Sequence, residues 1–300
     1  FEVTLESTNI QNKNFTWSSS FNIAFNKNKI LSLNYGQEQM TSYISWDQKF
    51  RNQIAYVSRV GESAGKMYGF VYDGTYKEED FNITVNENGK KTYELKPGVP
   101  KFKDGCQPGD PKYKNIDGSE DNLITDNDRT VIGNGHPLHT GGFTNNFVYK
   151  NWDLNIFLQW SYGNDVFNVN RLVMENPGAK KQLNQFASYK NRWSESNPTS
   201  NIPRVRAVGA DEYSSLYVED GSFLKLKTIS LGYNFDTKTL KRIGLSAARV
   251  FVSAENIATI TGYSGSDPEV STRHSVLTPG FDWSAYPRAF NASLGVNVTF

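Results

Sequence analysis

The sequence predicts an all-β fold, a transmembrane antiparallel β-barrel, and three observations lead to this prediction. Apolar and polar residues alternate without a break from Phe290 to Phe300. Several earlier segments show the same period of two. Three much longer stretches, of a length that compact soluble domains rarely hold as connections, separate these segments. A period of two indicates strands with one apolar and one polar face, and a terminal aromatic ring suits a membrane interface.

The composition allows this fold and excludes others. The chain has 300 residues, of which 37% are hydrophobic and 14% aromatic. Its mean hydropathy of −0.57 is compatible with a barrel, because only alternate strand residues face lipid. No run of about 18 apolar residues is present, which excludes a transmembrane helix. The formal net charge of +1 gives no sign of nucleic-acid binding, and the single Cys106 cannot form an internal disulfide.

We expect about eight strands, each identified by its alternation. Trp152 and Trp160 begin and end one apolar face, as expected for a strand between two aromatic belts. Leu224 and Leu226 have the opposite parity from the apolar residues that follow Thr228, and this phase change predicts a β-bulge. In chain order the expected strands are 2–9, 14–26, 30–35, 143–149, 152–161, 222–235, 249–257 and 290–300.

The lengths of the connections predict a topology. Barrels of this kind have short periplasmic turns, long extracellular loops and a periplasmic C-terminus. Counting back from Phe300 places every long loop outside, with 9–13 as the one short turn on that side. The other short connections are 26–29 and 150–151, and 236–248 is of medium length. The long extracellular loops are expected at about 36–141, 162–221 and 258–287.

These strands make only part of a barrel. The chain opens at Phe1 inside an alternating pattern with no signal peptide, so we expect it to be the C-terminal piece of a longer protein. The last expected strand ends the barrel. We expect barrel assembly to depend on its apolar residues, which are Leu294, Val296, Val298 and Phe300.

Short motifs along nearly the whole chain now suggest a family. The stretch from Val60 to Gly74 reads VGESAGKMYGFVYDG, and the stretch from Ser222 to Tyr233 reads SFLKLKTISLGY. Together with the motifs below, they resemble SusC/RagA-type TonB-dependent transporters. The remaining motifs, in order, are 108–114, 124–134, 142–146, 254–257, 263–270 and the terminal Phe300.

The resemblance implies the C-terminal portion, 1–300, of a barrel of about 22 strands in the Gram-negative outer membrane of Bacteroidetes-type bacteria. Such proteins take up nutrient oligosaccharides (glycans), or in some cases peptides, under a SusD-like surface lipoprotein that acts as a lid. TonB–ExbB–ExbD supplies the energy. The plug domain, the rest of the barrel and the signal peptide are expected to precede Phe1.

The acidic stretch 115–128 has two interpretations. The family often carries a calcium loop here, with carboxylates at alternating positions, and a hard cation needs about six oxygen ligands. In this chain Ser119 and Glu120 interrupt the usual Asp-Gly pair, and this departure favours a solvated loop with Asx turns. The candidate Ca²⁺ ligands are Asn115, Asp117, Asp121, Asp126 and Asp128.

The residues give no sign of catalysis, and no other cofactor is expected. His136 and His139 are spaced as metal ligands on a helix, but the glycines and the proline around them favour loop histidines, and His274 is the third. No His-Glu-x-x-His motif and no phosphate-binding glycine loop is present. The chain is therefore not expected to be an enzyme.

Two features of the expected outer loops are ambiguous. A basic stretch around Trp193 suits either a solvated loop or a contact with lipopolysaccharide or an acidic substrate. Its members are Lys190, Arg192, Arg204 and Arg206. Loop aromatics suit sugar stacking, loop packing or contact with the lid equally. They are Trp46, Tyr68, Tyr72, Tyr76, Trp193, Tyr213, Tyr217, Tyr263, Trp283 and Tyr286.

Two alternatives to active import remain at this level. A passive porin or adhesin barrel has the same strand pattern but no plug and no TonB contact. A soluble β-sandwich that binds carbohydrate also alternates, but it buries the apolar faces of its strands between two sheets. The exposure of the apolar face therefore separates a membrane barrel from a sandwich.

Overall fold

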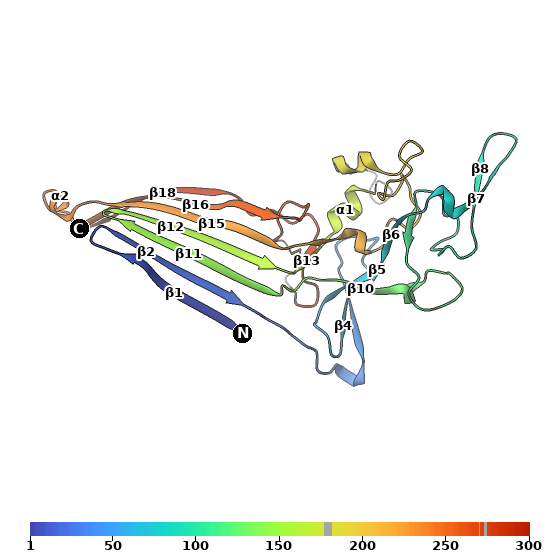
Figure 1. Cartoon of the computed structure of the whole chain (residues 1–300), viewed down its shortest axis with the longest axis horizontal. Helices are drawn as coiled ribbons and strands as arrows, with labels where there is room; N and C mark the ends of the chain where they lie inside the picture. Colours follow the sequence, from blue (N-terminus) through green and yellow to red (C-terminus); the bar gives the residue numbers. More distant parts are fainter. Residues whose placement is uncertain (177–181, 270, 273–274) are drawn as a thin grey trace.

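The computed structural model describes residues 1–176, 182–269, 271–272 and 275–300. One part is a long seven-stranded antiparallel sheet, and the other is a body of loops, short strands and short helices at one end of it (Figure 1). We call this body the loop cap. It consists of the described residues of the three long connections, 25–138, 163–222 and 262–290.

The sheet has the strand order β1-β2-β11-β12-β15-β16-β18, so its strands lie side by side in the order in which they follow along the chain. The three long connections join β2 to β11, β12 to β15 and β16 to β18. β1 and β18 are its edges, and the described residues form an open sheet. The strands are β1 (Glu2–Gln11), β2 (Phe15–Ala24), β11 (His139–Tyr149), β12 (Trp152–Tyr162), β15 (Phe223–Asn234), β16 (Ala247–Thr261) and β18 (Asn291–Thr299).

The strand expected at 30–35 is wrong. Residues 25–33 have no regular structure, Asn34–Gly36 form the short 3-10 helix η1, and β2 pairs directly with β11. Ile30 exchanges two backbone hydrogen bonds with the turn after β4 (Ile54–Arg59), Ile30 N–Glu62 O at 2.9 Å and Gly61 N–Ile30 O at 2.8 Å. The segment therefore joins the loop cap, and its alternating apolar residues are largely exposed, with Leu31 at 82%.

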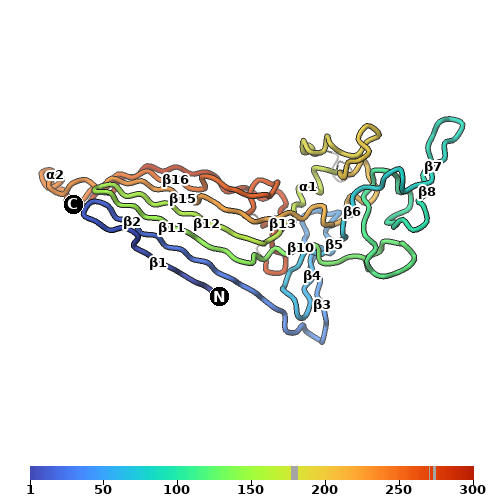
Figure 2. The backbone as a smooth tube through the Cα atoms, in the orientation of Figure 1, coloured from blue at the N-terminus to red at the C-terminus, as the bar shows by residue number. Residues whose placement is uncertain are grey.

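This correction also changes the topology. With one strand fewer, the turn after β1 lies at the same end of the sheet as the two-residue turn at 150–151, α2 (Thr237–Lys241) and the C-terminus (Figure 2). The expectation that 9–13 is an outer turn and 26–29 an inner turn is therefore wrong. All short connections lie at one end of the sheet, and all three long connections lie at the other. This follows because β2 and β11 are antiparallel neighbours, so the connection between them must leave and return at the same end.

One face of the sheet is apolar across every strand. Phe21 lies opposite Phe143, and Leu154 lies opposite Leu231. The β-bulge expected near Thr228 is confirmed, because the register of β15 shifts between Leu226 and Thr228 against both neighbours. Because of this shift, the apolar residues of both halves of β15 lie on the same face of the sheet. The opposite parity in the sequence thus has a direct structural cause.

The apolar face is not sealed in a protein interior. Trp152 is 48% exposed, Val252 47% and Leu294 78%. Leu154 and Ile156 are only partly buried. A β-sandwich would bury such residues against a second sheet, so their exposure argues against that alternative.

The loop cap contains the main core. Its largest aromatic cluster joins all three long connections, because Tyr56 comes from the first, Phe167 and Tyr213 from the second, and Phe281 from the third. Tyr56 donates a hydrogen bond to the carbonyl of Pro279 at 2.9 Å. Since the three connections share one core, they fold as one body beside the end of the sheet.

Short strands build the loop cap in four small sheets, in the orders β10-β5-β4-β3, β14-β13-β17, β6-β9 and β7-β8. No described helix is long and apolar enough to cross a bilayer. The strands are β3 (Gln39–Tyr43), β4 (Ile54–Arg59), β5 (Lys66–Phe70), β6 (Tyr72–Thr75), β7 (Phe81–Val85), β8 (Lys91–Leu95), β9 (Pro111–Tyr113), β10 (Arg129–Asn134), β13 (Asp165–Asn168), β14 (Val218–Asp220) and β17 (Phe281–Asp282). The helices are α1 (Val169–Met174) and the 3-10 turns η2 (Glu78–Asp80), η3 (Asp126–Asp128), η4 (Ala187–Asn191) and η5 (Ser215–Tyr217).

Candidate functional site

At the cap end of β15, the loop cap covers the polar face of the sheet and leaves the apolar face open. At the cap end of β15, Phe223 and Lys225 on the polar face are only 9% and 2% exposed. Leu224, between them on the apolar face, is 40% exposed, and its partner Ile260 is 72% exposed. The two faces of one strand thus have different environments at the same height. The third long connection therefore folds over the polar side.

An ionic cluster fastens this connection to the polar face. Lys225 contacts both Asp267, at 3.3 Å, and Glu269. Glu269 also contacts Lys227 at 3.4 Å and Arg288 at 3.2 Å. Three cations therefore face two carboxylates, and the most buried member is a lysine. Charges removed from water in this way need complete pairing, because an unpaired buried charge is costly.

Asp267 is ionised within this cluster. Burial opposes its charged form, but backbone hydrogen bonds from Arg288 and Glu269, together with Lys225, hold its pKa below the usual value. The carboxylate accepts from the backbone N–H of Glu269 and of Arg288, each at 3.0 Å. The cluster therefore fixes the backbone of the third connection as well as its side chains.

A second ionic network ties the third connection to the second. Arg171 on α1 contacts Glu175 and Glu219, each at 3.0 Å. Glu219 on β14 accepts hydrogen bonds from the backbone and the hydroxyl of Ser264, each at 2.8 Å. Burial raises the pKa of Glu219, but the hydrogen bonds from Ser264 and Arg171 outweigh it and leave that pKa below its usual value.

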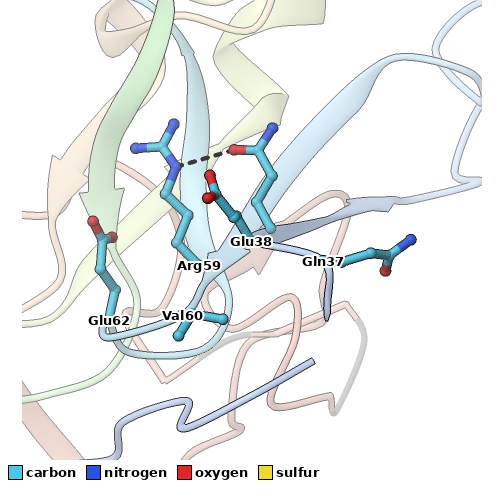
Figure 3. A pocket seen from close by; sticks show the side chains of 6 residues that line it. Gln37, Glu38, Arg59, Val60 and Glu62 are labelled. Carbon is cyan, nitrogen blue, oxygen red and sulfur yellow. Dashed lines mark hydrogen bonds between the residues drawn. The ribbon is translucent and has the colours of Figure 1, made fainter. Parts of the chain in front are cut away.

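An open pocket lies on the first connection, beside β3 and β4 (Figure 3). Its volume is about 760 Å³. Arg59 donates to Gln39 at 3.2 Å, and its guanidinium lies 5.7 Å from the ring centre of Tyr68. Amide, carboxylate and guanidinium groups offer paired donors and acceptors to a polar ligand. The lining residues are Gln37, Glu38, Gln39, Arg59, Val60 and Glu62.

The acidic stretch 115–128 satisfies its carboxylates within the chain. Asp128 is fully buried and accepts from the backbone N–H groups of Ile116 at 2.7 Å and Thr125 at 2.8 Å. Asp117 and Asp121 form Asx-type contacts with backbone N–H groups two residues further on. In the described part of the chain, no three His, Cys, Asp or Glu side chains are grouped to hold a metal ion. The contacts of Asp117 and Asp121 agree with the expected Asx turns, and the Ca²⁺ site involving Asn115 and Asp126 stays a prediction.

The remaining candidate residues are dispersed. His136 contacts the carbonyl of Ala64 at 3.0 Å, whereas His139 accepts from the indole of Trp160 at 3.1 Å. The third histidine, His274, lies outside the described residues. The dependence of assembly on Leu294, Val296, Val298 and Phe300 stays a prediction. The first three lie on edge strand β18 and Phe300 follows its end, with exposures of 78%, 62%, 43% and 92%.

Most of the loop aromatics pack the loop cap. Tyr76, Tyr213, Tyr217 and Tyr263 are buried, and Trp46 donates to the Tyr213 hydroxyl at 2.8 Å. By contrast, Tyr286 is 89% exposed. Of the three roles that the sequence left open for the loop aromatics, the buried residues therefore have the packing role.

Sequence reasoning did not identify the ionic cluster. Lys225 and Glu269 are 44 residues apart, and neither belongs to a chemical motif. One signal was available, because a lysine on the polar face of a strand next to a long connection needs an acidic partner. The Asp267-Pro268-Glu269 triplet, already part of a family motif, supplies that partner.

The chain is similar to curated outer-membrane receptors over its whole length. It is 33% identical over 305 residues to TonB-dependent receptor P3 of Formosa agariphila, covering 100% of this chain and 28% of the relative. It is 28% identical over 308 residues to TonB-dependent receptor SusC of Bacteroides thetaiotaomicron, covering 100% of the chain and 26% of the relative. The chain therefore spans between a quarter and a third of these relatives. No protein-family model matches it.

Solved structures show the same fold. The RagAB peptide transporter matches with a TM-score of 0.71 at 22% identity, over 100% of this chain and 29% of the matched chain. The RagAB peptide importer in its closed-closed state matches with a TM-score of 0.70 at 21% identity, over 99% and 29%. The partial coverage agrees with the open edges of the sheet.

Proposed function

Because the chain belongs to the SusC/RagA-type TonB-dependent receptors, which are outer-membrane proteins, we propose that it forms the C-terminal wall of their barrel. The seven strands then complete a cylinder of about 22 strands with the rest of the receptor. The apolar face meets lipid and the polar face lines the lumen. The whole receptor is a transporter rather than an enzyme, and it imports oligosaccharides or peptides.

The covering of the polar face by the loop cap at the cap end of β15 is the observation that carries this proposal. In a barrel, loops that fold over the polar face enter the mouth of the lumen, because the apolar face must stay in contact with lipid. Lys225 and Leu224, adjacent on one strand, differ in exposure as this arrangement requires. The cap therefore narrows the outer entrance and offers polar groups to a ligand that enters.

We place three partners and a ligand around this wall. A SusD-like lipoprotein covers the entrance, as the matched RagAB assembly suggests, and TonB–ExbB–ExbD supplies energy through segments outside this chain. Lipid surrounds the apolar face. The ligand is an oligosaccharide or a peptide.

The test is uptake in a strain that lacks the gene, with the full-length gene restored on a plasmid. We expect loss of uptake for one class of labelled oligosaccharide or peptide, and restoration by the intact gene but not by a variant without the TonB-binding segment. Unchanged uptake of every ligand in the deletion strain would contradict import. Equal restoration without the TonB-binding segment would favour the passive porin.

A further inference from the structure

The second long connection carries a concentrated positive charge. Residues 186–206, which we call the basic segment, contain four cations and one acidic residue, Glu195, in a chain whose formal net charge is +1. Among the described residues, Lys190, Arg192 and Arg206 have no ion pair. Arg204 is the exception, since it binds the fully buried Asp110 at 2.7 Å.

The basic segment is held firmly in place. Trp193 donates its backbone N–H to Ile202 at 2.8 Å, and Arg204 donates its own to Gly109 at 2.8 Å. The Trp193 indole packs so closely on Gly109 that a Cβ there would lie 2.4 Å from the ring. Tyr72 on β6 donates to the carbonyl of Asn201 at 2.6 Å. The cations therefore sit on a preorganised loop, which lowers the entropic cost of binding a ligand.

Two hydrogen-bond donors in the same segment lack acceptors. The Tyr189 hydroxyl and the Trp193 indole N–H are buried and have no partner among the described residues. Tyr189 as a whole is 6% exposed, and the Arg192 guanidinium lies 5.3 Å from its ring centre. Burial raises the pKa of Tyr189, so its hydroxyl keeps its proton at neutral pH. Buried donors of this kind are normally paired.

The unpaired charges of the basic segment therefore all have the same sign, and they can donate to an anion at the surface of the loop. The two buried donors lie inside the loop, out of reach of a ligand at its surface. A carboxylate or sulfate accepts hydrogen bonds from both guanidinium and ammonium groups. Arginine suits such groups particularly well, because its planar fork can donate two parallel hydrogen bonds.

The position of the basic segment separates two sources of such an anion. The segment, yellow to gold in Figure 1, lies in the loop cap beyond the end of the sheet. A ligand entering from water meets it, whereas lipopolysaccharide phosphates lie at the level of the lipid. The half-buried Trp193 also places an aromatic ring beside the cations, which suits an acidic sugar ring.

We propose that the basic segment binds the carboxylate or sulfate groups of an acidic oligosaccharide, with Lys190, Arg192 and Arg206 as the contacting cations. Arg204 positions the loop through Asp110. This inference rests on the proposed import only for its physiological consequence, since ligand binding can be measured without transport.

The experiment measures binding of tri-galacturonate to the purified full-length receptor by calorimetry, with its methyl ester as the neutral counterpart. We expect the acid to bind more tightly than the ester and to weaken as salt rises. The double variant R192Q/R206Q should lose about tenfold or more in affinity. The matched control is R242Q, an exposed arginine beside α2 at the opposite end of the sheet, and it should bind normally.

Three results would overturn the inference. They are equal affinity for acid and ester, unchanged affinity in R192Q/R206Q, and tighter binding of tri-glutamate or lipopolysaccharide than of tri-galacturonate. Import and binding can fail separately. Uptake of neutral ligands alone would refute the proposed binding by the basic segment and leave the proposed import intact. Binding of the acid without uptake of any ligand would refute import and leave the proposed binding intact.

Discussion

Replacing Glu269 by glutamine tests how the third long connection is held over the polar face. Glu269 accepts from three cations, Lys225, Lys227 and Arg288, and its side chain is 11% exposed. In E269Q these three cations face one carboxylate, Asp267. Lys225 is the most buried of the three cations and is only 2% exposed. Removing one partner of a buried ion pair typically costs about 3–5 kcal/mol. We therefore expect the connection to open locally.

The assay is backbone hydrogen exchange of the full-length receptor in detergent. A cost of about 3 kcal/mol raises the opening constant of residues 262–290 by at least about a hundredfold. The sheet should keep its protection, because its hydrogen-bond ladder does not involve Glu269. The change should thus appear as fast exchange confined to one connection.

Two matched variants make this prediction sharper. K225M leaves Glu269 with two cations, and Asp267 loses its ion pair but keeps its two backbone hydrogen bonds. Methionine fills the space of the lysine stem, so we expect a loss of about 1.5 kcal/mol. K227M removes a side chain that is 22% exposed and 3.4 Å from Glu269, so we expect less than about 1 kcal/mol. An effect of E269Q no larger than that of K225M would refute the reasoning from charge balance.

Three further predictions concern other parts of the molecule. V296R puts a charge on the apolar face and should cost about 2–4 kcal/mol in a membrane, whereas N297R on the polar face should cost much less; heat-modifiable gel mobility of the assembled barrel measures both. R204M leaves the fully buried carboxylate of Asp110 without its cation and should cost about 3–5 kcal/mol, read as faster proteolysis of the basic segment. The pKa of Glu219 is below its usual 4.5, so its contribution to the stability of the loop cap is complete above pH 4.5. That contribution is lost only as pH falls through the lower pKa of the folded state. Faster hydrogen exchange in α1 already above pH 4.5 would contradict this.

The sequence predicts the sheet well because the sheet leaves a local signal. Each strand shows its faces by alternation, and even the bulge near Thr228 appears as a change of parity. The same signal fails at 30–35, since a few alternating residues look alike whether they pair in a sheet or lie exposed. Ile30 finds its backbone partners at Gly61 and Glu62, and no local pattern indicates that pairing.

The candidate site is harder to predict for a related reason. The ionic cluster joins residues from a strand and a distant connection, and Arg171 reaches Glu219 across 48 residues. Sequence reasoning lists charged residues but cannot pair them over such separations. The same limit applies to loop aromatics, because burial of Tyr213 depends on where three connections meet.

The way the loop cap is joined limits how the entrance can open. Its three connections share one aromatic core, with Tyr56, Phe167 and Phe281 in mutual contact, so no connection can move far without disrupting that core. The ionic cluster, in contrast, joins the third connection to β15 through charged groups, with Lys225 bound to Asp267 and Glu269. Movement of the cap relative to the wall should follow release of this cluster, with the aromatic core intact.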